Sequence, residues 1–185
     1  MKTISTLKFA FTLLAVLFLS CKGQTSTEKS SGQDYSNVEL QEAIISGNVE
    51  AVKYHIKVGS DFNEKDSFTG STPLMTAATF GKTEIAKLLI EAKVDLNIQN
   101  NEGSTALHNA AFFCRQEIVK NLLEHGADKT IKNNYASTPL ASVEAPYAEV
   151  EGIYSYIKEQ LSPLGLELDI VRIKETRPVI VNILK

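Results

Sequence analysis

The sequence has no tryptophan, five prolines and only two cysteines among its 185 residues. Cys21 and Cys114 cannot form the set of disulfides that holds small secreted scaffolds together, so the fold must be stabilised by packing. Neither sign of charge prevails, because 19 lysines and arginines stand against 22 aspartates and glutamates. This balance excludes a strongly basic surface, and we therefore expect no nucleic-acid partner.

Long apolar segments are missing as well. The run Phe9–Leu19 would form about 17 Å of helix, whereas the hydrocarbon core of a bilayer needs about 30 Å. Lys2 and Lys8 precede this run and Cys21 closes it. This order of charged and apolar residues predicts a signal peptide over residues 1–20. Without its two lysines the chain keeps 17 cationic and 22 anionic residues, a net charge of −5.

The end of this leader resembles the bacterial lipobox, in which a small residue precedes a cysteine that becomes diacylated. The resemblance implies a lipidated Cys21 at the start of the mature chain. The usual pattern has leucine three residues before the cysteine, where this sequence has Phe18. Ordinary signal cleavage and an uncleaved anchor therefore remain open alternatives. We expect residues 21–36 to be the lipidated cysteine and a flexible linker, because they are rich in Ser, Thr and Gly and lack apolar periodicity.

The chain repeats itself with a period of 33 residues. STPLMTAATFG begins at Ser71, STALHNAAFFC begins at Ser104, and STPLASVEA begins at Ser137. A weaker copy before them places Leu40 in the position of Leu74. Self-similarity at a fixed period of this length is typical of a stacked repeat array. The equivalent interior positions would be Leu40, Leu74, Leu107 and Leu140.

The residue pattern within each unit predicts two helices. Thr72 can cap the first helix, and Pro73 stands at its first position, where the missing N–H costs nothing. Small Ala77 and Ala78 would let that helix approach its neighbours closely. A second helix follows Gly81, with Ile85, Leu88 and Leu89 on one face.

These residues resemble the ankyrin repeat, whose hallmark is Thr-Pro-Leu-His-x-Ala-Ala followed by Gly, Ile-Val-x-Leu-Leu and Gly-Ala-Asp. The third unit matches through Thr105, Leu107, His108, Ala110, Ala111, Ile118, Val119, Leu122, Leu123, Gly126, Ala127 and Asp128. The resemblance implies an all-α ankyrin-repeat solenoid of stacked helix-turn-helix pairs over 37–160, with a C-terminal helical cap. We expect units at 37–65, 66–98, 99–131 and 132–160, and capping helices at 161–185.

Some positions depart from this pattern. Cys114 replaces the glycine between the two helices, so a positive φ there would store about 1 kcal/mol of strain. In the fourth unit Pro146 precedes a helix that we expect to bury Ile153, Tyr156 and Ile157. Further on, Pro178 predicts two short helices, at 169–176 and 178–184, because a residue before proline disfavours the helical region.

The resemblance also implies a binding surface, because the turn tips and first helices of ankyrin repeats line a concave face that binds other proteins. The positions that correspond to it are Phe68, Thr69, Phe80, Asn101, Glu102, Phe112, Phe113 and Tyr135. Exposed aromatic residues gathered on one face are typical of binding hot spots. In the alternative interpretation, Phe80 and Phe113 fill gaps between stacked units.

Nothing in the sequence indicates catalysis. His108 and Cys114 are six residues apart, so a helix would point them about 240° away from each other. The cysteines and histidines do not have the spacing of zinc ligands, and we expect neither a metal nor a cofactor. His108 stands at the family's own histidine position, which implies hydrogen bonds between adjacent turns. Cys114 is expected to be a small buried side chain, with a redox-sensitive thiol as the alternative.

The leading hypothesis is a monomeric, lipid-anchored protein of the bacterial cell envelope that faces the periplasm, binds another protein and has no catalytic activity. Without lipidation it would be secreted or periplasmic. Two alternatives concern the partner: an immunity or inhibitor protein that neutralises a toxin or enzyme, and a scaffold for envelope stress protection. A catalytic C-terminal region is the alternative from another class, although its polar groups, Arg172, Lys174 and Arg177 among them, are expected to form solvated helix faces.

Overall fold

Helices make up the regular secondary structure of residues 34–185, the part of the chain that the computed structural model describes. The predicted signal peptide, Cys21 and the linker up to Gln33 lie outside these residues. Within the described range, no helix is both long and apolar enough to cross a membrane. The elements are α1 (Leu40–Ser46), α2 (Val49–Val58), α3 (Pro73–Phe80), α4 (Thr83–Glu91), α5 (Ala106–Phe112), α6 (Gln116–Glu124), α7 (Pro139–Glu144), α8 (Tyr147–Leu161), η1 (Ser162–Leu164) and α9 (Ile170–Leu184).

The predicted caps start the first helix of three units. The side chains of Thr72, Thr105 and Thr138 each accept a hydrogen bond from the backbone N–H three residues further on. Pro73 and Pro139 occupy the first helical position that the sequence assigned to proline. These bonds satisfy N–H groups that have no partner within the helix, so local sequence alone fixes where each unit begins.

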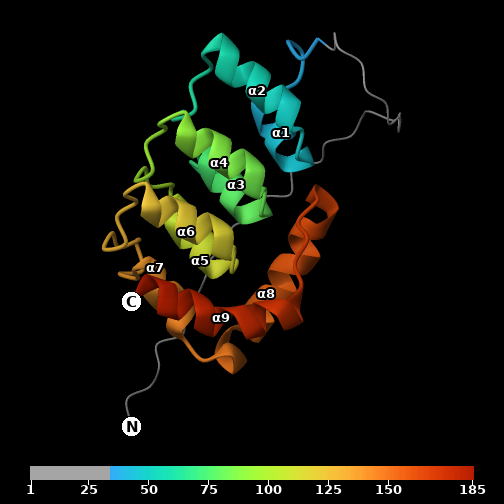
Figure 1. The fold of residues 1–185 in the computed structure, drawn as a ribbon. Coiled ribbons are helices and arrows are strands. Elements are labelled where there is room, and N and C mark those ends of the chain that lie inside the picture. The colour runs from blue at the N-terminus through green and yellow to red at the C-terminus, as the bar shows by residue number, and fades with distance from the viewer. Residues whose placement is uncertain (1–33) are drawn as a thin grey trace. The chain divides into compact units, whose positions relative to one another are not determined.

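Successive helix pairs stack side by side (Figure 1), and the predicted all-α solenoid is confirmed. The helix α3 packs between α1 and α5, and α5 packs between α3 and α7. Their alanine pairs are fully buried, which allows this close approach. Leu74 and Leu107 are buried in one shared core, whereas Leu40 and Leu140 are half-buried against it because they belong to the end units.

Cys114 adopts the conformation that the sequence pattern requires of it. Its φ is 54°, close to the 68° of Gly81 at the equivalent turn of the preceding unit. A side chain in this left-handed region costs about 1 kcal/mol. The expected strain is therefore present, and the turn keeps its shape because the two helices around it are held by the stack.

The C-terminal region differs from the prediction of two short helices. A single helix, α9, runs through Pro178. Pro178 lacks the N–H that would bond the carbonyl of Lys174, but both residues are exposed, so water can satisfy that carbonyl. Beyond the proline, Ile180 and Leu184 are buried in the core, and their burial favours continuing the helix.

The helix α9 occupies the outer place of the fourth unit. It packs against α6 and α7, while α8 extends along the side of the stack and has most of its helix contacts with α9 and η1 (Figure 1). The expected apolar face of α8 was partly wrong, since Tyr156 is 50% exposed. Ile157 is buried as predicted and Ile153 is half-buried, while Val150 and Tyr154 supply the rest of the buried face. The helix that follows α7 in sequence therefore is not the helix that completes its unit.

His108 links two units through its ring. Its Nε2 lies 3.0 Å from the carbonyl oxygen of Ser137, and the backbone N–H of Thr105 donates to Nδ1 over 3.2 Å. Because Nδ1 accepts, Nε2 carries the proton and donates to Ser137. The hydrogen bond between adjacent turns that the resemblance implied is therefore present. Burial lowers the pKa of His108, since the charged imidazolium is less well solvated here.

We expect this histidine to make the protein less stable in mild acid. Its folded pKa lies below its unfolded value, so protons bind the unfolded chain first, and the contribution is complete above the unfolded value of about 6.5 and is lost as the pH falls. Urea unfolding between about pH 7.5 and about pH 5.5 should show a loss of at most about 1.4 kcal/mol per pH unit from this group. The variant His108→Gln should have a smaller pH dependence than the wild type. If the free energy of unfolding changed equally with pH in the two proteins, the pH dependence could not be assigned to His108.

Candidate functional site

The turns that connect successive units share one construction. A side-chain oxygen of Asp66, Asn100 or Asn133 accepts backbone hydrogen bonds from its own turn, two and up to five residues further on. These side chains fold each turn locally, as Asp and Asn do in Asx turns. These side chains were not among the residues predicted from the sequence, although a signal was present: an Asp or Asn precedes each capping threonine by five or six residues.

Neighbouring turns are joined to one another by backbone and amide hydrogen bonds. Asn101 donates from its backbone N–H to Thr69 O and from its side-chain amide to Phe68 O, over 3.0 and 3.1 Å. Asn134 makes the same pair of bonds one unit later, to Glu102 O and Asn101 O. A Cβ at Gly70 would collide with Asn101, so glycine permits this close approach.

These hydrogen-bonded turns form a ladder with an exposed surface, which we name the turn-tip surface. It consists of Phe68, Thr69, Asn101, Glu102 and Tyr135. Phe68 is 69% exposed and Tyr135 is 37% exposed, large values for aromatic side chains. Glu102 lies half-buried between them, and burial raises the pKa of its carboxyl. In residues 34–185, no lysine or arginine forms an ion pair with Glu102. The five predicted binding residues of the turns therefore share one rigid, acidic and aromatic surface.

The other three predicted residues lie elsewhere. Phe80, Phe112 and Phe113 contact the buried side of α8 in a second apolar cluster. Phe113 is only 7% exposed, and the ring of Phe112 stacks on Tyr154 with centroids 4.8 Å apart. Residues of α8, of the segment 166–168 and of α9 complete this cluster, so the structure does not join the three phenylalanines to the turn-tip surface. Their packing favours the structural interpretation that the sequence left open for Phe80 and Phe113.

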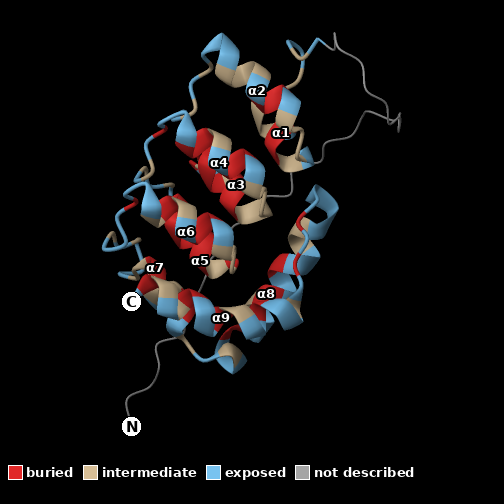
Figure 2. Ribbon diagram, in the orientation of Figure 1, coloured by how far each residue is buried: buried red, intermediate tan, exposed pale blue. Residues whose placement is uncertain are grey.

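A buried arginine anchors α8 to α9. Arg177 is 3% exposed and donates to the hydroxyl of Tyr154 over 2.7 Å and to the carbonyl of Ala145 over 2.6 Å. The Tyr154 hydroxyl in turn donates to Phe112 O over 2.7 Å. Burial raises the pKa of Tyr154, which keeps it protonated and able to donate. The expectation that Arg177 lies on a solvated face was therefore wrong; Figure 2 shows buried residues where α8 and α9 meet.

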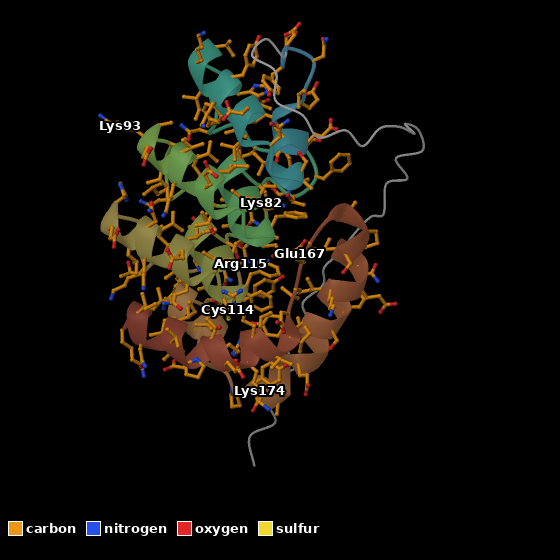
Figure 3. The ribbon with its side chains drawn as sticks, turned by 45° about the vertical axis from the view of Figure 1, so that its right-hand side comes forward. Lys82, Lys93, Cys114, Arg115, Glu167 and Lys174 are labelled. Carbon is orange, nitrogen blue, oxygen red and sulfur yellow. The ribbon has the colours of Figure 1, made fainter. Side chains whose placement is uncertain are left out.

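A second arginine holds the segment between α8 and α9. The Nη2 atom of Arg115 donates to the carbonyls of Thr79 and Glu167, over 3.1 and 3.2 Å (Figure 3). Its guanidinium lies against Gly81, where a Cβ would come within 2.7 Å of it. The side chain thus ties the C-terminal segment to the turns of two units, although the two residues Arg115 and Glu167 are 52 positions apart.

Cys114 does not have the properties of a reactive thiol. It is half-buried, and burial raises the pKa of its thiol to about 11, so almost none of it is thiolate at neutral pH. Its sulfur lies 3.8 Å from the carbonyls of Phe112 and Ile173, while the ring of His108 is engaged with Thr105 and Ser137. Within the described residues, no group of three or more His, Cys, Asp or Glu side chains is placed to hold a metal ion.

Comparisons with known proteins agree with this architecture. The mouse (Mus musculus) protein phosphatase 1 regulatory subunit 27 is 42% identical over 63 residues, which are 34% of this chain and 40% of that protein. The human (Homo sapiens) protein of the same name is 41% identical over 63 residues, with the same coverage. The chain therefore spans less than half the length of these relatives.

A solved structure and a family profile extend the similarity. The crystal structure of the ankyrin repeat domain of Bcl-3, a member of the IkappaB protein family, aligns with a TM-score of 0.54 and 30% identity, over 56% of this chain and 45% of that one. The family described as "Ankyrin repeats (3 copies)" matches residues 40–133, which is half of the chain. The stacked helix pairs and this match together show that the chain belongs to the ankyrin repeat family.

Proposed function

We propose that this protein binds another protein through the turn-tip surface and has no catalytic activity of its own. The observation that carries the proposal is the placement of Phe68, Glu102 and Tyr135 on turns that are hydrogen-bonded into one ladder. Rigid aromatic side chains can bury a large area without losing much conformational freedom. Ankyrin repeats imply protein–protein interaction, and the relatives that match are named as regulatory subunits, which supports a role through contact.

The partner surface that fits best is basic. Glu102 has no cation beside it in the described residues, and the chain without its leader carries a net charge of −5. A lysine or arginine of a partner could pair with Glu102 and lie against the ring of Tyr135, which would combine an ion pair with a cation–π contact. This favours a second, narrower role, that of an inhibitor or immunity-type protein that covers a basic enzyme or toxin.

The expected result for the turn-tip surface is a selective loss of binding. Phe68→Ala combined with Tyr135→Ala should abolish capture of the partner by the full chain, because both large contacts are removed from the same surface. Helical content and the unfolding midpoint should stay within error, since both side chains are exposed. Affinity capture with quantitative mass spectrometry and circular dichroism would measure the two effects.

A matched control separates this surface from exposed aromatic residues in general. Tyr156 is also exposed, but lies on α8, away from the turns, so Tyr156→Ala should capture the partner as the wild type does. Phe112→Ala is a poor choice because Phe112 stacks on Tyr154. The proposal fails if the double variant retains the partner, or if Tyr156→Ala loses it equally.

We further propose that lipid on Cys21 anchors the protein to a bacterial envelope membrane, on its periplasmic face. The support comes from the leader sequence alone, with its lysines, apolar run and closing cysteine. Cells supplied with a palmitate analogue should label the wild-type protein and leave the variant Cys21→Ala unlabelled. An unlabelled wild type would contradict lipidation and leave protein binding untouched, because the two proposals rest on different parts of the chain.

A further inference from the structure

A surface cavity of about 380 Å³, open to solvent, lies between the C-terminal end of α7 and the helix α9. Its walls combine the apolar side chains of Val143, Tyr147 and Val181 with the cationic side chains of Lys174, Arg177 and Lys185. This volume is within the range of small-molecule sites. The cavity lies at the opposite end of α7 from Tyr135, so it is separate from the turn-tip surface.

The charges around this cavity do not balance. Arg177 is almost fully buried, yet its hydrogen-bond partners are the hydroxyl of Tyr154 and the carbonyl of Ala145, which are both neutral. Glu144 is the acidic residue of the wall, and its carboxylate is 4.0 Å from Lys185. Two cations, Arg177 and Lys174, therefore remain without an anionic partner among residues 34–185.

The position of Lys174 adds to this excess. Its Nζ lies 5.7 Å from the centre of the Tyr147 ring, so the cation is held at the cavity wall (Figure 3 labels Lys174 at the base of α9). A buried guanidinium costs free energy unless an anion or several hydrogen bonds compensate it. Arg177 has two hydrogen bonds and lies 5.7 Å from the centre of the Tyr154 ring, but these groups are neutral. An anion in the cavity would add an opposite charge, and a guanidinium with a nearby ammonium binds carboxylates strongly.

We propose that this cavity binds a carboxylate carried on a short apolar group, with Arg177 and Lys174 holding the carboxylate and the half-buried Tyr147 and Val181 contacting the apolar part. The chemistry of the wall selects this class. A phosphate dianion would be repelled by Glu144 at the edge more strongly than a carboxylate, which carries half the charge, and it would leave the apolar wall uncovered. A neutral apolar ligand would leave the cations without a partner. The same chemistry is offered by a small carboxylic acid and by the C-terminus of a protein that ends in an apolar residue.

Paired probes test this site and distinguish the two sources. The full chain is titrated with N-acetyl-leucine and with N-acetyl-leucinamide, and also with a six-residue peptide ending in leucine, as the free acid and as the amide. Calorimetry gives the affinity, and backbone amide NMR shifts give the place. We expect both acids to bind about tenfold more tightly than their amides, because the amides cannot form charge-assisted hydrogen bonds. Resonances of Val181 and Asn182 should shift.

Variants at exposed positions keep the test independent of folding, since replacement of the buried Arg177 could unfold α8. Lys174→Gln removes one cation of the wall, and Asn182→Glu adds an acid to it; each should weaken binding of the free acid by about tenfold. Lys158→Gln removes the same charge from the exposed side of α8 and should leave the affinity unchanged.

The outcomes are distinct. Tighter binding by the peptide acid than by N-acetyl-leucine identifies a protein C-terminus as the ligand, and equal binding identifies a small acid; both support the site. Equal binding of acids and amides, or no shift at Val181 and Asn182, would overturn the proposal. Weakening by Lys158→Gln as large as that by Lys174→Gln would also overturn it, because the attraction would then be a property of the whole surface charge.

Discussion

Replacing Leu122 by alanine is expected to lower the free energy of unfolding by about 2–5 kcal/mol. Leu122 is fully buried, and its helix α6 packs against both α4 and α9. Removing three carbons leaves a cavity that the surrounding helices can close only in part, because each is fixed by its own neighbours in the stack. The change should therefore loosen the third unit and weaken the docking of α9 on it.

Urea unfolding followed by circular dichroism measures this effect. The matched control is Leu164→Ala, which removes the same atoms from a side chain that is 53% exposed and should change the stability by less than about 0.5 kcal/mol. Leu89→Ala, at the equivalent place in the preceding unit, should resemble Leu122→Ala because Leu89 is equally buried. Similar midpoints for Leu122→Ala and Leu164→Ala would refute a core that continues through these units.

The variant Tyr154→Phe is expected to cost about 1–3 kcal/mol although it removes a single oxygen atom. That oxygen accepts a hydrogen bond from Arg177 and donates one to Phe112 O, each over 2.7 Å. Without it, a buried guanidinium N–H loses its partner and the carbonyl of Phe112 loses its hydrogen bond from Tyr154. The cost is the desolvation of these two groups, since the phenylalanine ring fills the same space.

The comparison for this prediction is Tyr156→Phe, which removes a hydroxyl from an exposed ring of the same helix. In thermal unfolding, the midpoint of Tyr154→Phe should lie below that of the wild type, and the midpoint of Tyr156→Phe should equal it. Hydrogen exchange should also become faster in α8, because Tyr154 connects this helix to α5 and α9. Wild-type stability in Tyr154→Phe would mean that the bonds of Arg177 do not hold α8 in place.

Much of the stack was predictable from residues close together in the sequence. The caps at Thr72, Thr105 and Thr138 and the prolines at first helical positions act within one turn of helix, so they require no knowledge of distant contacts. The positive φ of Cys114 was predictable for a related reason, since the turn between the two helices has a residue of positive φ in each of the first three units and Gly81 occupies the equivalent position.

The candidate site was predicted only in part. Phe68 and Tyr135 are exposed at turn tips as the register of the repeat implies. The same register placed Phe112 and Phe113 at positions that line the binding face in other ankyrin repeats. It could not predict that both would pack in a cluster with residues of α8. The prediction for Arg177 was wrong because an arginine on a helix is usually exposed. Its burial depends on hydrogen bonds to Tyr154 and Ala145, which lie more than twenty residues away in the sequence.

The amino-acid sequence by itself determined the period of the repeat, the start of the first helix in three units and most of the residues that face the shared core, because these features depend on contacts within a few residues. Only the tertiary structure decided that α9 completes the fourth unit, that Phe113 is buried in a second cluster with residues of α8, and that Arg177 is buried beside a cavity. In α9, Ile180 and Leu184 join the core of the stack, whereas Val150, Tyr154 and Ile157 of α8 lie in the second cluster. Both outcomes depend on apolar contacts between side chains far apart in the chain, which local sequence patterns do not specify.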